Sequence, residues 1–321
     1  MSGFTITAGV SFSGGITMTE APVPTGNTAG WFGGGGNAGV MSTVQRITYA
    51  TDTATASARG PLSVISRNLA AAGNETNGWF GGGYSSAAIS TVQRITYATD
   101  TATASVRGPL SAVTYNSAAA GNTTDAWFGG GYFTRSTVNR ITFATDTATA
   151  SVRAPLNSGR SYLAAAGNTT DAWFGGGKAP NQSSTVQRIT YATDTATASV
   201  RGPLSSARYI LAATGNTTDG WFGGGMVATP SFEYLSTVNR ITYATDTVTA
   251  SVRGPLSSAR YSLAAAGNTT DGWFGGGQGA GEPGTESIVD RITFATDTAT
   301  ASVRGPLSSA RYKLAAAGGI Q

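Results

Sequence analysis

The residues of this sequence that could perform acid–base chemistry are carboxylates, because the 321-residue chain contains no histidine and no cysteine. Two carboxyl groups about 5 to 10 Å apart across one pocket can hydrolyse a glycosidic bond. Glu233 could pair with Glu282 or Glu286 of the adjacent repeat, so a glycan hydrolase is one of three hypotheses. The acids outside the regular pattern of the chain are Glu20, Glu75, Glu233, Glu282, Glu286 and Asp290.

The missing residue types exclude most other catalytic chemistry. Without histidine and cysteine, no thiolate, imidazole, disulfide or zinc or copper site of the usual kinds can form. Oxygen-rich segments such as residues 122–125 lack the clustered acids of a calcium site and are interpreted as β-turns. The glycine triplets precede no helix, which argues against a phosphate-binding loop. The leading interpretation is therefore a protein without catalytic residues, metal or cofactor.

A better place for specificity is the segment that follows each glycine triplet, because its sequence differs from copy to copy. Aromatic faces beside a few polar groups suit the recognition of a sugar or a protein. The alternative is that these loops pack only on themselves and bind no ligand. The candidate binding residues in the loops are Tyr84, Tyr132, Phe133, Arg135, Lys178, Phe232, Glu233, Tyr234, Glu282 and Glu286.

These loops interrupt a sixfold repeat. In every copy 33 positions separate the arginine that opens the RIT block from the next tryptophan, whereas 13 to 19 positions separate a tryptophan from the next block. Length changes confined to one loop are typical of a binding surface on a repeat scaffold. We interpret the repeated tryptophans and block arginines as scaffold: Trp31, Trp79, Trp127, Trp173, Trp221, Trp273, Arg46, Arg94, Arg140, Arg188, Arg240 and Arg291.

Each repeat of about 49 residues reads as four short strands divided by turn signals, without a helical period. In the last full repeat we expect strands over residues 260–267, 272–277, 287–295 and 300–307, with Ile292 and Phe294 on one face of the third. The final residues form a first strand without a second, and residues 30–35 form a second strand without a first. Joining them predicts an all-β, six-bladed β-propeller closed by both ends of the array.

The order of motifs resembles kelch repeats over residues 27–321. The matching residues are Gly275–Gly276, Phe294, residues 296–300, Pro306 and Arg311. The sequence departs from kelch in one respect, since its tryptophan lies on the second strand and Ala301 takes the usual tryptophan position on the fourth. The resemblance implies kelch-like four-stranded blades.

Residues 1–25 lie outside the array, and residues 26–321 form the propeller. Alternating apolar residues at positions 4 to 12 indicate a short β arm, which could pack on its own ring or add to the sheet of a neighbour, giving a homo-oligomer. Together with the nearly identical Thr/Ala/Gly-rich repeats, this arm resembles virion proteins of marine tailed phages. The resemblance implies a fibre- or tail-type component of the virion, which attaches to other virion proteins through residues 1–25 and recognises a glycan or protein on the host surface.

The second hypothesis is a free-standing, cytoplasmic kelch-like module that binds a protein or glycan. The net charge of +4 does not by itself indicate nucleic acid, because 16 of the 20 basic residues recur with the repeat. We expect no nucleic-acid partner, and the lack of an apolar run of about 20 residues predicts no membrane insertion. The basic residues outside the pattern are Arg67, Arg135, Lys178 and Lys313.

Overall fold

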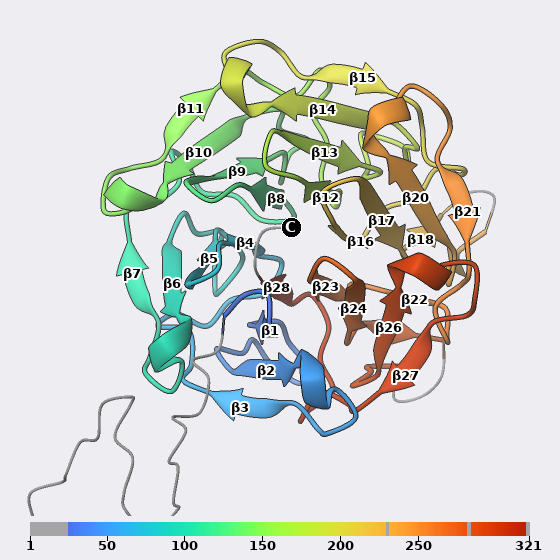
Figure 1. Cartoon of the computed structure of the whole chain (residues 1–321). Coiled ribbons are helices and arrows are strands. Elements are labelled where there is room, and N and C mark those ends of the chain that lie inside the picture. The colour runs from blue at the N-terminus through green and yellow to red at the C-terminus, as the bar shows by residue number, and fades with distance from the viewer. Residues whose placement is uncertain (1–24, 229–230, 281–283, 319–321) are drawn as a thin grey trace, which may run out of the picture.

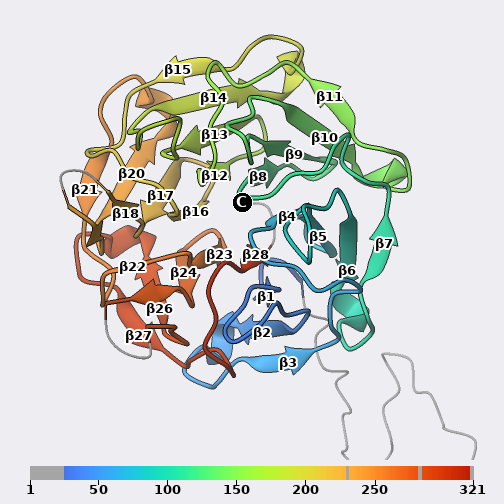
Figure 2. The same ribbon diagram turned by 180° about the vertical axis from the view of Figure 1, so that it is seen from behind.

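The computed structural model describes residues 25–228, 231–280 and 284–318. Six four-stranded antiparallel sheets surround a common axis, so the chain is a six-bladed β-propeller, as predicted (Figure 1 and, from behind, Figure 2). The arm predicted over residues 1–25 lies outside the described residues apart from Thr25.

The blades are numbered in chain order, and the strands of each are given from the axis outward. The first blade consists of β28 (Ala315–Ala317), β1 (Ala29–Gly33), β2 (Val44–Thr48) and β3 (Ser57–Arg59), the second of β4 (Ala70–Gly73), β5 (Asn77–Gly81), β6 (Val92–Thr96) and β7 (Ser105–Arg107), and the third of β8 (Ala118–Gly121), β9 (Asp125–Gly129), β10 (Val138–Thr142) and β11 (Ser151–Arg153). The fourth blade consists of β12 (Ala164–Gly167), β13 (Asp171–Gly175), β14 (Val186–Thr190) and β15 (Ser199–Arg201), the fifth of β16 (Ala212–Gly215), β17 (Asp219–Gly223), β20 (Val238–Thr242) and β21 (Ser251–Arg253), and the sixth of β23 (Ala264–Gly267), β24 (Asp271–Gly275), β26 (Val289–Thr293) and β27 (Ser302–Arg304).

The first blade is assembled from both ends of the array. Strand β28 pairs antiparallel with β1, with Trp31 opposite Ala317 and Gly33 opposite Ala315. The predicted closure is therefore confirmed, and it gives this blade the same four strands as the other five. Alanine recurs on the inner strands because six of them converge on one axis, where a larger side chain would collide with its neighbours.

One of the predicted strands is interrupted and another is shortened. The expected strand over residues 260–267 is divided into β22 (Arg260–Tyr261) and β23, because Ser262 between them has a φ of 58°. Strand β22 pairs with β25 (Gln278–Gly279), and β18 (Met226–Val227) pairs with β19 (Glu233–Tyr234) in the preceding blade. The fourth strand is also shorter than predicted, since β27 covers only Ser302–Arg304.

The prediction that Phe294 shares a strand face with Ile292 is wrong. Strand β26 ends at Thr293, and Phe294 opens the short 3-10 helix η6 (Phe294–Thr296). The helix turns the ring of Phe294 onto Trp221 of the preceding blade, at 3.8 Å between ring centroids. The corresponding helices of the other blades are η1 (Tyr49–Thr51), η2 (Tyr97–Thr99), η3 (Phe143–Thr145), η4 (Tyr191–Thr193) and η5 (Tyr243–Thr245).

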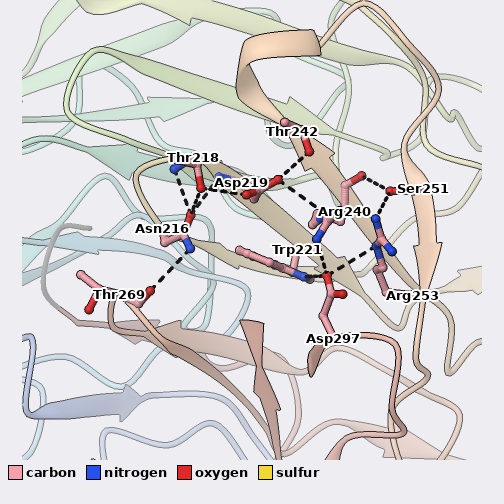
Figure 3. Close-up of polar contacts among 10 residues, drawn as sticks. All are labelled: Asn216, Thr218, Asp219, Trp221, Arg240, Thr242, Ser251, Arg253, Thr269 and Asp297. Carbon is pink, nitrogen blue, oxygen red and sulfur yellow. Dashed lines mark hydrogen bonds and ion pairs between the residues drawn. The ribbon is translucent and has the colours of Figure 1, made fainter. Parts of the chain in front are cut away.

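The interface between blades repeats one polar arrangement, shown for the fifth and sixth blades in Figure 3. Asp297 accepts a 2.9 Å hydrogen bond from the indole nitrogen of Trp221 and a 3.1 Å bond from Arg240, and Arg253 approaches it to 3.5 Å. All three donors belong to the preceding blade, and each repeated tryptophan is at most 1% exposed. The repeated tryptophan and the block arginine of each blade thus contact an aspartate of the following blade. The other aspartates that receive this triple contact are Asp52, Asp100, Asp146, Asp194 and Asp246.

The glycines of the WFGGG motif are required for two structural reasons. A Cβ atom on Gly33 would lie 2.9 Å from the ring of Phe80 in the next blade, so only glycine allows this close approach. Gly34 and Gly35 have φ values of 68° and 91°, which residues with a side chain rarely adopt. The motif therefore combines blade-to-blade packing with the turn that starts the variable loop.

The NTTD segments form identical turns at the opposite end of the blades. Asn216 accepts 2.9 Å hydrogen bonds from the backbone of Thr218 and Asp219 through its side-chain oxygen, which is an Asx turn (Figure 3). Its side-chain nitrogen donates to the carbonyl of Thr269 in the next blade at 3.5 Å. These turns are therefore structural features of the ring.

Candidate ligand-binding face

Six residues with positive φ surround a pocket on the axis, at the end of the inner strands opposite the NTTD turns. We call this the mouth pocket; leucines and Ser117 lie beneath the six residues in its wall. Each of the six lies two residues before the start of an inner strand, at φ values between 57° and 62°. They are Asn68, Asn116, Tyr162, Ile210, Ser262 and Lys313.

A closed circle of backbone hydrogen bonds links these six residues. The N–H of Asn116 donates to the carbonyl of Asn68 at 2.8 Å, and every other member donates in the same way to its counterpart in the preceding blade. The N–H of Asn68 completes the circle by donating to the carbonyl of Lys313 at 2.8 Å. The backbone is thus held by main-chain bonds alone, and the six side chains are free of any structural role in this circle.

Sequence reasoning missed these positions. They lie in the constant 33-residue interval, where we expected only scaffold, whereas the loops drew attention by their changing lengths. A signal was nevertheless present, because this one position reads Asn, Asn, Tyr, Ile, Ser and Lys in successive repeats while the residues that follow it change little. A position that varies within a segment of constant length carries a side chain that the fold does not require.

The variable loops lie beside the mouth residues. Tyr84 forms a β-bridge with Arg67, and Lys178 forms one with Ser161. In the loop between these two along the chain, the backbone N–H of Tyr132 donates to the carbonyl of Tyr115 at 2.9 Å. The loops and the mouth residues therefore form one continuous surface, which we call the variable face.

One aromatic cluster on this face includes three of the predicted binding residues. Tyr115 stacks on Tyr132 at 4.2 Å between ring centroids and meets Tyr84 edge-on at 5.4 Å. Phe133 packs against Tyr132 at 3.8 Å and is 74% exposed. Partial burial, reinforced by a hydrogen bond with Tyr132, raises the pKa of Tyr115 to about 12. Tyr115 was not among the predicted residues, although the structure places it at the centre of the cluster.

A second aromatic group lies on the later blades. Tyr234 packs against Tyr261 at 4.8 Å, and the hydroxyl of Tyr261 donates to the side-chain carbonyl of Gln278 at 2.6 Å. Burial raises the pKa of Tyr261 to about 12, and the neighbouring Tyr234 adds to the shift. Phe232 is 75% exposed in the same loop. The two groups place flat, partly exposed rings on both sides of the mouth pocket.

All four basic residues outside the repeat pattern lie on the variable face. Arg67 lies 5.6 Å from the ring centroid of Tyr84, Lys178 lies 5.4 Å from Tyr209, and Lys313 lies 4.9 Å from Tyr312. Burial, together with the positive charge of Arg67, lowers the pKa of Lys313. The fourth residue, Arg135, lines a separate pocket at the edge of the third blade. This face therefore combines aromatic rings with positive charge.

The described carboxylates among those considered for catalysis do not all lie on one face. Asp290 is fully buried and pairs with Arg260 at 2.6 Å, and Glu75 accepts a 3.1 Å hydrogen bond from Asn27 beside an NTTD-type turn. Glu233 and Glu286 lie on the variable face, in loops of adjacent blades. Glu20 and Glu282 lie outside the described residues.

Within residues 25–228, 231–280 and 284–318, no group of three or more acids is arranged to hold a metal ion. None of the helices described has the length and apolar character needed to cross a membrane. Comparison with known protein families identified no match for this chain, and comparison with curated proteins identified none either.

Proposed function

We propose that the chain is a non-enzymatic binding protein whose variable face recognises a ligand, and that it serves as a fibre- or tail-type component of a phage virion. The observation that supports this proposal is the separation of variable and constant residues. The loops and the mouth positions, which differ between repeats, lie on one face, while the Asx turns on the other face are nearly the same in the second to sixth blades. A surface that varies on a constant scaffold is what recognition requires.

The chemistry of the face favours a glycan with acidic groups on the host surface. Tyr132 and Phe133 offer exposed rings on which a sugar can stack, since the apolar face of a pyranose packs against an aromatic ring. Arg67 and Lys313 lie close enough at the mouth for the charge of one to lower the pKa of the other, so an incoming carboxylate or sulfate would relieve their repulsion. A protein ligand with an acidic patch would use the same groups.

The experiment is a glycan array probed with the full chain and with the double variant Tyr132→Ala/Phe133→Ala. We expect binding to acidic glycans and at least about a tenfold loss of affinity in the variant, because two stacking surfaces are removed. Val248→Ala is a suitable control, since Val248 is also an exposed apolar residue, at 62%, but lies close in sequence to the interface aspartate Asp246 and outside the loops. Unchanged binding by the double variant, or turnover of the glycan, would contradict the proposal.

Assembly into a virion requires a separate test, which concerns residues 1–25. Their deletion should abolish incorporation into particles while leaving ligand binding intact. A chain that is found only as a free monomer, with unchanged behaviour after the deletion, would instead favour the free-standing module. We also propose that the protein has no nucleic-acid partner, because most of its arginines are held in the interfaces between blades.

A further inference from the structure

Four blades contain a buried arginine just before the inner strand, with its guanidinium group held inside the blade. Arg208 donates from Nη1 to the carbonyl of Thr237 at 2.9 Å and to that of Gly224 at 3.4 Å, and from Nη2 to Asn239 Oδ1 at 3.0 Å. Its side chain is fully buried. The equivalent residues in the other three blades are Arg160, Arg260 and Arg311.

The blade holds this cation largely with neutral acceptors. Arg160 and Arg311 use the same pair of main-chain carbonyls as Arg208, whereas only Arg260, among the four, also pairs with a carboxylate, that of Asp290. Burial lowers the pKa of Arg160, Arg208 and Arg311 to about 10, which still leaves them charged at neutral pH. Carbonyl and amide oxygens therefore suffice to hold a guanidinium group here.

The third blade has the same acceptors but no arginine. Thr114 takes the place of Arg208, while Gly130, Thr137 and Asn139 correspond to Gly224, Thr237 and Asn239. The amide of Asn139 also has the same orientation, because its Oδ1 accepts a 2.9 Å hydrogen bond from the backbone of Ser111 as Asn239 does from Ser205 at 3.0 Å.

The space that an arginine side chain fills in the fifth blade is a pocket in the third. Thr114, Gly130, Thr137 and Asn139 line it. Thr114 is only 5% exposed, and its hydroxyl has no hydrogen-bond partner within the described part of the chain. The edge of the pocket includes Val152, which is 58% exposed, so the pocket is open to solvent.

We propose that this pocket binds a guanidinium group from outside the chain, with Gly130, Thr137 and Asn139 accepting its hydrogen bonds. A planar guanidinium matches the site because its nitrogen atoms donate in a fixed fork, and the internal arginines occupy the same set of acceptors in that way. The group can be the side chain of an arginine on a partner protein or a small free guanidinium compound. This inference is independent of the ligand proposed for the variable face.

Arg135 limits the affinity of the site, because its own positive charge lines the pocket. The equivalent position is Ser183 in the fourth blade, where it accepts a 3.4 Å hydrogen bond from Arg160, and Glu286 in the sixth, where it favours the charged form of Arg260. Replacing Arg135 by serine therefore gives the third blade the environment in which a guanidinium is already bound. The second blade also lacks the arginine, but there Ser63 and Val64 both donate to the side-chain oxygen of Gln93, so the counterpart of the amide acceptor that Asn139 offers is already occupied.

The test is isothermal titration calorimetry of the full chain with methylguanidinium, compared with methylammonium, which carries the same charge without the fork. We expect methylguanidinium to bind at least about tenfold more tightly, and Arg135→Ser to strengthen its binding by at least about threefold. Titration with N-acetyl-arginine-N-methylamide separates the two sources. If it binds as well, an arginine of a partner fits the site; if only methylguanidinium binds, the ligand is a small compound, and either result supports a guanidinium site.

Two variants make the assignment specific. Thr114→Arg should abolish binding, because the new side chain occupies the pocket as Arg208 does, while Thr114→Ser should bind like the unaltered chain. Arg208→Thr should create a second site with Asn239, raising the stoichiometry from one to two. Binding that persists in Thr114→Arg, equal binding of methylammonium, or no binding even to Arg135→Ser would overturn the proposal.

Discussion

The indole nitrogen of Trp273 donates a 2.9 Å hydrogen bond to Asp52, although 221 positions of sequence separate the two residues. Arg291 bonds to the same carboxylate oxygen at 3.1 Å, and Arg304 approaches it to 3.5 Å. The contact joins the sixth blade to the first, so the interface that closes the ring has the same chemistry as the five interior ones. The ring therefore needs no special device at the junction of its two ends.

Replacement of Asp52 by asparagine should lower the free energy of unfolding by about 1–3 kcal/mol, because two arginines lose a partly buried counter-charge. Equilibrium unfolding in urea measures the effect. Asp194→Asn changes an interior interface and is the matched control, which should cost about the same. A much smaller effect at Asp52 would show that the closing interface is weaker than the others.

The tyrosines stacked on the repeated tryptophans predict an alkaline transition. Burial raises the pKa of Tyr49, Tyr97, Tyr191 and Tyr243 above its ordinary value of about 10. Because the folded state favours the protonated form, this stabilising contribution is complete below about pH 10 and is lost as the pH rises beyond it. These four hydroxyls should ionise only as the ring unfolds, which ultraviolet absorbance and circular dichroism can follow together.

The control for this transition already exists in the sequence, where Phe143 and Phe294 occupy the stacking position of two blades. Changing all four buried tyrosines to phenylalanine should move alkaline unfolding to a higher pH. Ionisation of the four hydroxyls well below the unfolding transition would contradict their burial.

Ile210 should be replaceable with a gain in stability. Its φ of 58° is unfavourable for a β-branched residue, whereas Asn68 and Asn116 occupy the same conformation at lower cost. Ile210→Asn should stabilise the protein by about 1 kcal/mol, measured by thermal unfolding. Asn116→Ile is the reverse change and should destabilise the ring by a similar amount, so an effect of the same sign in both variants would refute the argument.

Ser117 should tolerate leucine. Five blades place a leucine in the wall of the mouth pocket, and Ser117 takes this position in the third blade, 8% exposed and with its hydroxyl unpartnered among the described residues. Ser117→Leu should stabilise the ring by about 1 kcal/mol or more, since it removes a buried polar group and fills the apolar wall. Ser117→Ala separates the two terms, and a loss of stability in both variants would contradict this explanation.

The blade count and the closure could be predicted from the sequence because each depends on the spacing of recognisable motifs. The glycine triplet demands a turn, and an incomplete unit at each end implies that the two must join. The 3-10 helix at Phe294 could not be predicted, since its aromatic residue continues the strand pattern of Ile292 and changes direction only to reach Trp221 in the next blade.

The candidate site was predictable only in part. The loops that carry Tyr132 and Lys178 were identified by their variation, but Ile210 and Lys313 at the mouth were not. Neither is a residue type that signals a left-handed backbone, and the conformation arises from the hydrogen bond each donates to the preceding blade. Such a constraint exists only once the ring has assembled.

The circle of hydrogen bonds at the mouth has an electrostatic consequence. All six run in the same rotational sense, so the components of their peptide dipoles in the plane of the ring sum to zero, unlike the parallel dipoles of a helix. On the axis of the ring the backbone circle thus contributes no net in-plane field, and the lateral force on an approaching ion there comes chiefly from side chains such as Arg67 and Lys313. A single charge reversal there would redirect which ions the ring attracts without disturbing the fold beneath it.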